Sequence, residues 1–188
     1  MTKSIAEKQN KGISPQQFID GMTKNQEAFL GWSDKFVWTN DEDRAFFESL
    51  QKRDDLRVHI LMADWCGDVV RNIPVVFKAL EAGSLPVEVL IMEEHLDTMD
   101  QYLTMGGRSV PVVIFADPQG NVLGQWGPRP VYIQEPMVAF KQANPDREAA
   151  DYQANLAETR QEIMRRYGEG TEYQALIIKE LRSLIESF

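Results

Sequence analysis

Short apolar runs recur through the middle of the chain, at residues 57–63 (RVHILMA), 87–92 (VEVLIM) and 111–115 (PVVIF). Runs of this length and composition are typical of strands that are covered on both faces. A fourth run, residues 122–126 (VLGQW), follows the turn sequence DPQGN at 117–121, which predicts a hairpin between the third and fourth strands. Helical patterns separate the first three runs, so the sequence predicts parallel pairing among these strands and one antiparallel edge.

Apolar positions three and four residues apart predict helices before, between and after these strands. A capping serine followed by proline begins one helix at Ser14-Pro15, and Asn40 begins another. Pro74 and Pro136 lie inside two of the predicted helices, where we expect a break or a kink. Two of the predicted helices begin at residues 15 and 41. Four more cover residues 66–81, 96–105, 131–142 and 152–167, and a last helix begins after a cap at Thr171.

Composition limits the classes of function. The chain has 188 residues, 43% of them hydrophobic, which is enough for one domain with a sizeable core. Its formal net charge of −9 disfavours binding to nucleic acid or to anionic membranes. The first twelve residues lack the apolar stretch of a secretory signal, and no apolar run approaches the roughly 20 residues that span a bilayer. A single cysteine rules out an internal disulfide, so we expect a soluble protein of the reducing cytoplasm.

One short segment is the best candidate for chemistry. Residues 63–69 (ADWCGDV) place Cys66, the single cysteine, directly after the first predicted strand and at the start of a helix. In α/β sheets, sites form at the carboxyl ends of the parallel strands. Val69 stands where a second cysteine would complete a Cys-x-x-Cys motif, so any thiol chemistry depends on one sulfur. His59 and His95 lack the spacing of metal ligands, so we expect no metal site and no cofactor.

Several landmarks around Cys66 occur in the order and on the elements expected of a known family. They are Trp65-Cys66-Gly67, Pro74 eight residues after the cysteine, Ser109-Val110-Pro111 before the third strand, and Gly127 after the hairpin. With this combination the chain resembles the thioredoxin family over about residues 55–142. The segments MDQYLT, GGRS and WGPR resemble a little-characterised bacterial branch of that family.

The resemblance implies a thioredoxin-like α/β fold of three layers, α/β/α, with a mixed central sheet. Residues 1–54 and 143–188 would then be helical extensions of the core, together forming one compact domain. Apolar stripes on the two C-terminal helices predict packing against that core, the alternative being a partner-binding or dimer surface.

The resemblance also implies a substrate groove around the thiol. Pro111 is expected to be a cis-proline that presents the Val110 backbone to an extended peptide. Val69 replaces the resolving cysteine and Ile60 replaces a buried acid of the family, which excludes a dithiol cycle. A mixed disulfide on Cys66 would therefore need an outside thiol for its release. The expected groove residues are Trp65, Gly67, Asp68, Val69, Ser109, Val110, Pro111 and Gly127.

The place of Cys66 at a helix N-terminus favours its thiolate, because free N–H groups and the helix dipole face the sulfur. Asp64 and Asp68 oppose ionisation, and Arg71 and Arg108 would offset them if they point toward the sulfur. We therefore expect a modestly lowered pKa for the Cys66 thiol. A value at or above the ordinary one of about 8.5 would count against a reactive thiol.

Three functions remain open. The first is a monothiol redox protein in which Cys66 attacks a disulfide of a protein or of a low-molecular-weight thiol. The second is a redox-inactive module that holds an extended peptide in the groove, and replacing Cys66 by Ser separates these two. The third, an iron–sulfur cluster shared as in monothiol glutaredoxins, has only the faint support of residues 108–111, since other glutaredoxin features are missing.

Other charged residues are weaker candidates. His95 follows the second strand and is either a proton shuttle or part of a solvated loop. Arg108 is an auxiliary candidate beside the groove. His59 lies mid-strand and is expected to be a core or surface residue. Arg129 is predicted to form a surface ion pair, the alternative being a contact with an acidic group of the substrate.

Overall fold

The computed structural model describes residues 3–188. Its centre is a four-stranded sheet in the order β2-β1-β3-β4. The strands are β1 (Arg57–Met62), β2 (Val87–Ile91), β3 (Val112–Ala116) and β4 (Val122–Trp126). β1 pairs parallel with β2, whereas β1 with β3 and β3 with β4 are antiparallel. The mixed α/β sheet predicted from the sequence is therefore present.

The direction of β3 differs from the parallel pairing that we predicted. A parallel strand would require a connection long enough to return the chain to the opposite end of the sheet. The connection after β2 contains only the short 3₁₀ helix η3 (Met92–Glu94) and the one-turn helix α5 (Leu96–Met99), so the chain stays at the carboxyl end of β1. β3 begins there, with Val112 paired to Leu61, and runs the other way. This reversal brings Pro111 next to the loop that follows β1.

The predicted helix over residues 96–105 also ends early, at Met99. Thr104 and Gly107 instead pair with each other across Met105 and Gly106, which have positive φ angles of 48° and 74°. Two successive residues with positive φ form the tight turn of a two-residue hairpin. The glycine favours this turn over another helical turn.

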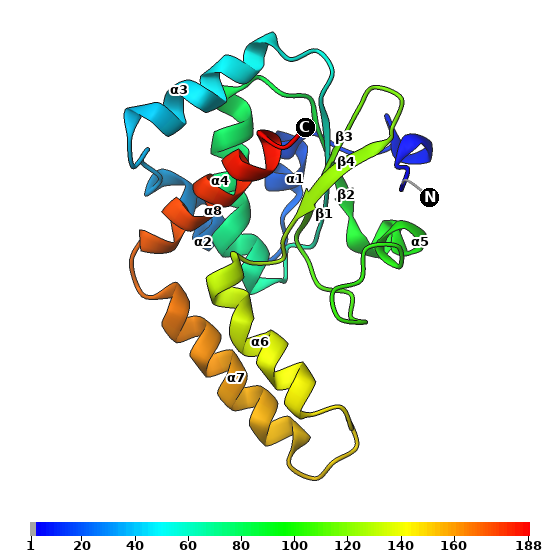
Figure 1. Ribbon diagram of the computed structural model, residues 1–188, viewed down its shortest axis with the longest axis vertical. Helices are drawn as coiled ribbons and strands as arrows, with labels where there is room; N and C mark the ends of the chain where they lie inside the picture. The colour runs from blue at the N-terminus through cyan, green and yellow to red at the C-terminus, as the bar shows by residue number, and fades with distance from the viewer. Residues whose placement is uncertain (1–2) are drawn as a thin grey trace.

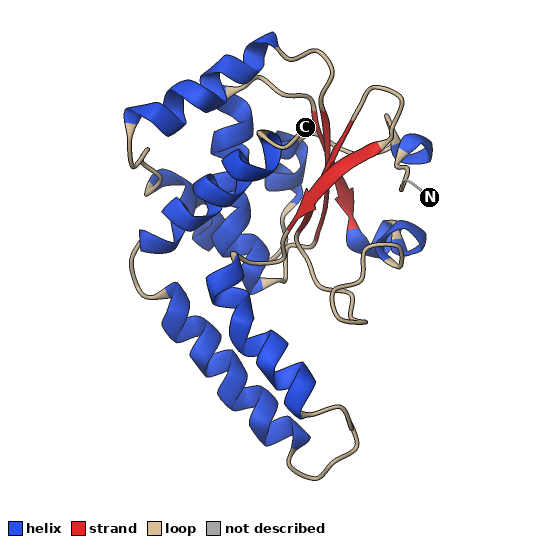
Figure 2. Cartoon of the chain, viewed as in Figure 1, coloured by secondary structure: helices blue, strands red, loops and turns tan. Residues whose placement is uncertain are grey.

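Helices cover the two faces of the sheet unequally (Figures 1 and 2). One face carries a thick layer of α2, α3, α4 and α8, and the other carries α5 and the N-terminal segment. The helices of the N-terminal half are α1 (Pro15–Gly21), α2 (Gln26–Asp34), α3 (Asp41–Ser49) and α4 (Gly67–Ala82). Those of the C-terminal half are α6 (Val131–Ala143), α7 (Tyr152–Tyr167) and α8 (Glu172–Ile185). Along residues 3–188, no helix is both long and apolar enough to cross a membrane.

The helix starts show which local signals were reliable. Ser14 and Gln17 form the predicted capping box of α1, and the Asn40 side chain accepts a hydrogen bond at the start of α3. Thr171 stands at the N-cap of α8, but its side chain makes no capping hydrogen bond. α4 continues through Pro74, and α6 likewise continues through its internal proline.

The N-terminal segment lies across the sheet end opposite Cys66. The backbone N–H of Ile5 donates to the carbonyl of Gly120, and Ile13 pairs with Val89 in β2. The short 3₁₀ helix η1 (Ala6–Lys8) lies between these two contacts. The segment thus joins the hairpin turn to the other edge of the sheet.

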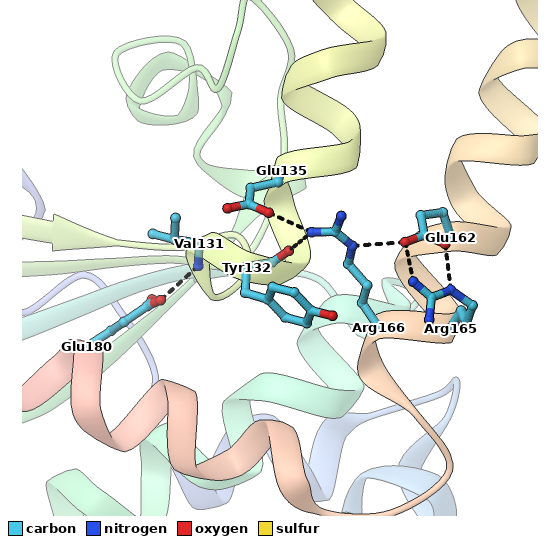
Figure 3. Close-up of polar contacts among 7 residues, drawn as sticks. All are labelled: Val131, Tyr132, Glu135, Glu162, Arg165, Arg166 and Glu180. Carbon is cyan, nitrogen blue, oxygen red and sulfur yellow. Dashed lines mark hydrogen bonds and ion pairs between the residues drawn. The ribbon is translucent and has the colours of Figure 1, made fainter.

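Helices α6 and α7 form an antiparallel arm that projects from the body (Figure 1). At its base, Arg166 of α7 reaches the Glu135 carboxylate and the Tyr132 carbonyl of α6, and it also pairs with Glu162 (Figure 3). Glu180 of α8 accepts a hydrogen bond from the first N–H of α6 (Figure 3). The Arg166 contacts therefore join the two helices of the arm, and the Glu180 contact attaches the arm to α8.

Candidate functional site

Cys66 lies where β1 ends and α4 begins. It is the N-cap residue of α4, with extended backbone angles, and its side chain is half-buried. Its Sγ donates to the carbonyl oxygen of Val110 at 3.3 Å. The structure therefore brings the thiol and the loop before β3 together, as the sequence predicted, although they are 44 residues apart.

The loop before β3 is held by its neighbours. The Val110–Pro111 peptide bond is cis, as the sequence predicted, and a second cis bond between Gly127 and Pro128 was not anticipated. Gly127 has φ +116°, and a Cβ there would lie 2.2 Å from the Pro111 carbonyl oxygen. The absence of a side chain at Gly127 lets the chain after β4 pack against Pro111. Ser109, half-exposed, donates its N–H to the Gly107 carbonyl at the outer end of the same loop.

The acidity of the thiol differs from the prediction. Burial raises the pKa of Cys66, and the nearby Asp68 carboxylate raises it further. The backbone N–H groups of Val69 and Asp68 and the charge of Arg129 act in the opposite direction but do not outweigh these effects on the pKa. The expected modest lowering was wrong because the sequence does not show how far the sulfur is withdrawn from water.

The two arginines expected to favour the thiolate point elsewhere. The Arg71 guanidinium lies over the rings of Trp32, Tyr173 and Tyr167, at 4.0, 4.7 and 5.0 Å from their centroids. Arg108 forms an exposed ion pair with Asp100 in its own loop, at 2.7 Å.

Arg129 is instead the cation beside the thiol. Its Nε and Nη2 atoms contact the two carboxylate oxygens of Asp68 at 2.8 and 2.7 Å. Each side chain of this pair is only 15% exposed, so the pair lies inside the site rather than on the surface. Tyr167, from the end of α7, donates its hydroxyl to the same carboxylate at 2.8 Å. Sequence reasoning missed Tyr167, which appeared only as part of a packing stripe 99 residues away.

Asp64 and Trp65 form the other side of the site. The Asp64 carboxylate accepts from the N–H groups of Thr23 and Lys24, at 2.8 and 3.0 Å. Desolvation acts to raise its pKa, but these hydrogen bonds outweigh it and the pKa of Asp64 is lowered. Trp65 is 47% exposed next to the cysteine, and its ring nitrogen donates to Glu93 at 2.6 Å.

Two of the positions that depart from the thioredoxin pattern are core positions, whereas the third, Asp68, is half-buried at the site. Val69 and Ile60 are both inaccessible to solvent. The side chains at these two positions therefore provide neither a resolving sulfur nor a buried acid. Gly67, in the first turn of α4, is exposed and leaves that side of the sulfur open.

The histidines lie apart from the thiol. His95 precedes α5, where burial and the charge of Lys8 lower its pKa, and it makes no hydrogen bond to Cys66. The proton-shuttle role is therefore unsupported by the geometry. His59 is buried in β1, 3.3 Å from a Glu88 oxygen. Within the described residues, no three His, Cys, Asp or Glu side chains are placed to hold a metal ion.

A family model described as thioredoxin matches residues 12–153 of this chain. The chain belongs to the thioredoxin family. The matched region includes Cys66, Asp68 and Arg129 and ends near the start of α7, so it excludes Tyr167.

Curated proteins similar to this member of the thioredoxin family include anterior gradient protein 2 homologues of Mus musculus and Homo sapiens. Each is 26% identical over 115 residues, which cover 59% of this chain and 65% of the relative. The chain thus matches slightly less than two-thirds of the length of these relatives.

Two solved structures align with nearly the whole chain. One is PA1234, a protein of unknown function from Pseudomonas aeruginosa, with a TM-score of 0.64, 20% identity and 98% of both chains covered. The other is an HIV epitope-scaffold, with a TM-score of 0.64, 18% identity and 99% of both chains covered. At these identities the likeness shows the fold alone, including the terminal helices outside the thioredoxin core.

Proposed function

We propose that this protein is a monothiol member of the thioredoxin family in which Cys66 forms mixed disulfides with a protein or a low-molecular-weight thiol. The position of the sulfur is the observation that supports this most strongly. It is half-buried at the start of α4 and 3.3 Å from the Val110 carbonyl. An extended partner that pairs with the Val110 backbone would bring its own sulfur to Cys66.

The exchange proceeds in two balanced steps. The Cys66 thiolate attacks one sulfur of the partner's disulfide, forms a new S–S bond and expels the other sulfur as a thiolate. An external thiolate then attacks the partner's sulfur in the mixed disulfide, and Cys66 leaves and takes up a proton. The chain has one cysteine, so the second step requires the external thiol. A reducing compartment such as the cytoplasm would supply it.

The raised pKa of Cys66 counts against a rapidly reacting thiol and favours slow exchange. A smaller thiolate fraction at neutral pH slows the attack, and a thiol of high pKa is also a poor leaving group. Once formed, the mixed disulfide would therefore persist. These properties are more typical of a protein that holds its partner for a long time than of an enzyme that turns over many disulfides.

Intact-mass analysis tests this proposal. The protein is isolated from cells under acid quenching, which stops thiol exchange, with the Cys66→Ser variant as the control. We expect a defined adduct on the parent chain that a reductant removes and that the variant lacks. A parent chain that carries a free thiol even after the cells have been exposed to a disulfide oxidant would contradict the proposal.

A second function, a redox-inactive peptide-binding module, is favoured by the same raised pKa and by the missing second cysteine. In that case Cys66 would act only as a hydrogen-bond donor to Val110. The Cys66→Ser variant would then keep its affinity for a co-purifying partner under non-reducing and reducing conditions alike. Loss of the partner on reduction instead supports the mixed disulfide.

A further inference from the structure

The Asp68 carboxylate is held from two directions by segments distant in sequence. Asp68 lies in the first turn of α4, two residues after Cys66. Arg129, from the loop after β4, contacts both of its oxygens, and Tyr167, from the end of α7, donates to one of them. A bidentate guanidinium and a hydroxyl together leave the carboxylate little freedom to rotate.

The partners of Asp68 are themselves fixed. Asn72, which is inaccessible to solvent, donates to the Tyr167 hydroxyl at 2.8 Å and to the Pro128 carbonyl at 3.0 Å. Arg129 donates a third hydrogen bond to Gln134 of α6. One buried amide thus connects the end of α7 to the loop that carries Arg129.

We infer that Arg129 and Tyr167 are positioning residues of the thiol site, which hold the Asp68 carboxylate beside Cys66 and thereby control the ionisation of the thiol. This inference deepens the proposed function and rests on it. It also assigns a role in the site to the C-terminal extension, since Tyr167 lies outside the region matched by the family model.

Asp68 and Arg129 are the charged side chains that act on the ionisation of the Cys66 thiol. Asp68 opposes ionisation of Cys66 and Arg129 favours it. The other charged candidates are turned away: Asp64 toward the start of α2, Arg71 into its aromatic cage and Arg108 toward Asp100. The two members of the ion pair therefore act on the thiol with opposite signs and partly cancel.

The pH dependence of Cys66 alkylation by iodoacetamide tests the inference in the full-length chain. We expect Asp68→Asn to lower the midpoint by roughly one pH unit and Arg129→Gln to raise it by a smaller amount, because the charge of Arg129 affects the thiol less than that of Asp68. The double variant should lie between the two single variants, and Arg129→Lys should restore part of the Arg129→Gln shift. Single-variant midpoints that equal that of the parent chain, or that move in the same direction, would overturn the inference.

Tyr167→Phe removes one hydroxyl and provides a test even if a charge variant does not fold. The carboxylate loses a donor, so we expect a rise in the midpoint smaller than that of Arg129→Gln. Tyr173→Phe is the matched control, because this neighbouring buried tyrosine donates to the Arg71 carbonyl and not to Asp68. A midpoint that moves equally in both variants, or in neither, would remove Tyr167 from the site.

Different results would contradict the proposed mixed-disulfide function and the positioning roles of Arg129 and Tyr167. Alkylation reports only the ionisation of the thiol and requires no partner. Variant midpoints that shift as expected in a chain that never forms an adduct in cells would contradict the proposed function alone. A chain that forms the adduct but has an insensitive midpoint would contradict only the roles of Arg129 and Tyr167.

Discussion

Gly127 shows how one backbone position holds the site together. Its φ of +116° is rarely adopted by residues with a side chain, and the Pro111 carbonyl occupies the space that a Cβ would need. The loop after β4 thereby packs directly on the loop that faces Cys66. Arg129, two residues further on, reaches Asp68 because of this contact.

Gly127→Ala is expected to lower the free energy of unfolding by roughly 3 kcal/mol, because it combines backbone strain with a steric clash. Urea unfolding measures the change. Gly21→Ala is the control, since nothing lies near a Cβ at that helical position, and its stability should be unchanged or slightly higher. Equal effects of the two substitutions would contradict the close packing at Gly127.

Val69 occupies the position at which a second cysteine would complete a Cys-x-x-Cys motif. It is inaccessible to solvent, and its backbone N–H hydrogen-bonds toward Cys66. A side chain at this third helical position therefore lies one turn behind the sulfur. The missing second sulfur would lie at this position.

We predict that Val69→Cys forms an internal disulfide with Cys66 and reduces the amount of mixed disulfide recovered from cells, because release no longer depends on an external thiol. Mass spectrometry of the oxidised chain measures both species. Val69→Ala controls for the loss of volume alone and should leave the adduct in place. If Val69→Cys carries as much adduct as the parent chain, release of the mixed disulfide by a second cysteine is not the step that the parent chain lacks.

At the scale of elements, α8 holds the start of α6 in place. Pro130, the N-cap residue of α6, offers no side-chain cap, so the Val131 N–H is satisfied by Glu180 of α8. The other oxygen of Glu180 accepts from the buried Trp126 ring nitrogen at 2.7 Å. A single carboxylate therefore links α8, β4 and the arm.

Glu180→Ala is expected to reduce the free energy of unfolding by about 2 kcal/mol, because one buried donor and one helix start lose their acceptor. Glu180→Gln keeps an acceptor and should cost less. The control is Glu158→Ala, an exposed position on α7, which should change stability little. Urea unfolding of the three variants measures these changes. Similar losses of stability in Glu180→Ala and Glu158→Ala would show that Glu180 does not stabilise the start of α6.

At the scale of the whole molecule, the N-terminal segment and the sheet enclose a histidine. His59 is 2% exposed, and its neighbour Glu88 accepts hydrogen bonds from the Asn10 N–H. Burial lowers the pKa of His59 and outweighs the attraction of the Glu88 carboxylate, which raises it. Protonation of this residue is therefore easier in the unfolded chain than in the folded one.

Stability should consequently fall as the pH drops from about 7 to 5.5, because the unfolded state binds more protons in that window. One proton contributes at most about 1.4 kcal/mol per pH unit. His59→Gln should flatten the dependence measured by urea unfolding at several pH values. His95→Gln is the comparison, since the pKa of His95 is also lowered but this residue is only half-buried. An unchanged slope in His59→Gln would show that His59 ionises normally.

Sequence reasoning succeeded where the signal was local. The strands, the capping box at Ser14 and the start of α4 at Cys66 follow from adjacent residues and their periodicity. Helix α2 was missed because its N-cap, Asn25, has a left-handed backbone and makes no capping hydrogen bond. The contact between Cys66 and the loop before β3 was predicted because the landmarks of the thioredoxin family keep a characteristic order along the chain.

The sequence by itself determined that this protein has a single cysteine, placed at the start of a helix, and no second cysteine to pair with it. Both facts depend only on which residues occur and in what order. The tertiary structure decided the direction of β3, the withdrawal of Cys66 from water and the meeting of Asp68 with Arg129 and Tyr167. Solvation and charge pairing depend on what packs around a group. For Cys66 these neighbours come from segments up to a hundred residues away, which no local pattern encodes.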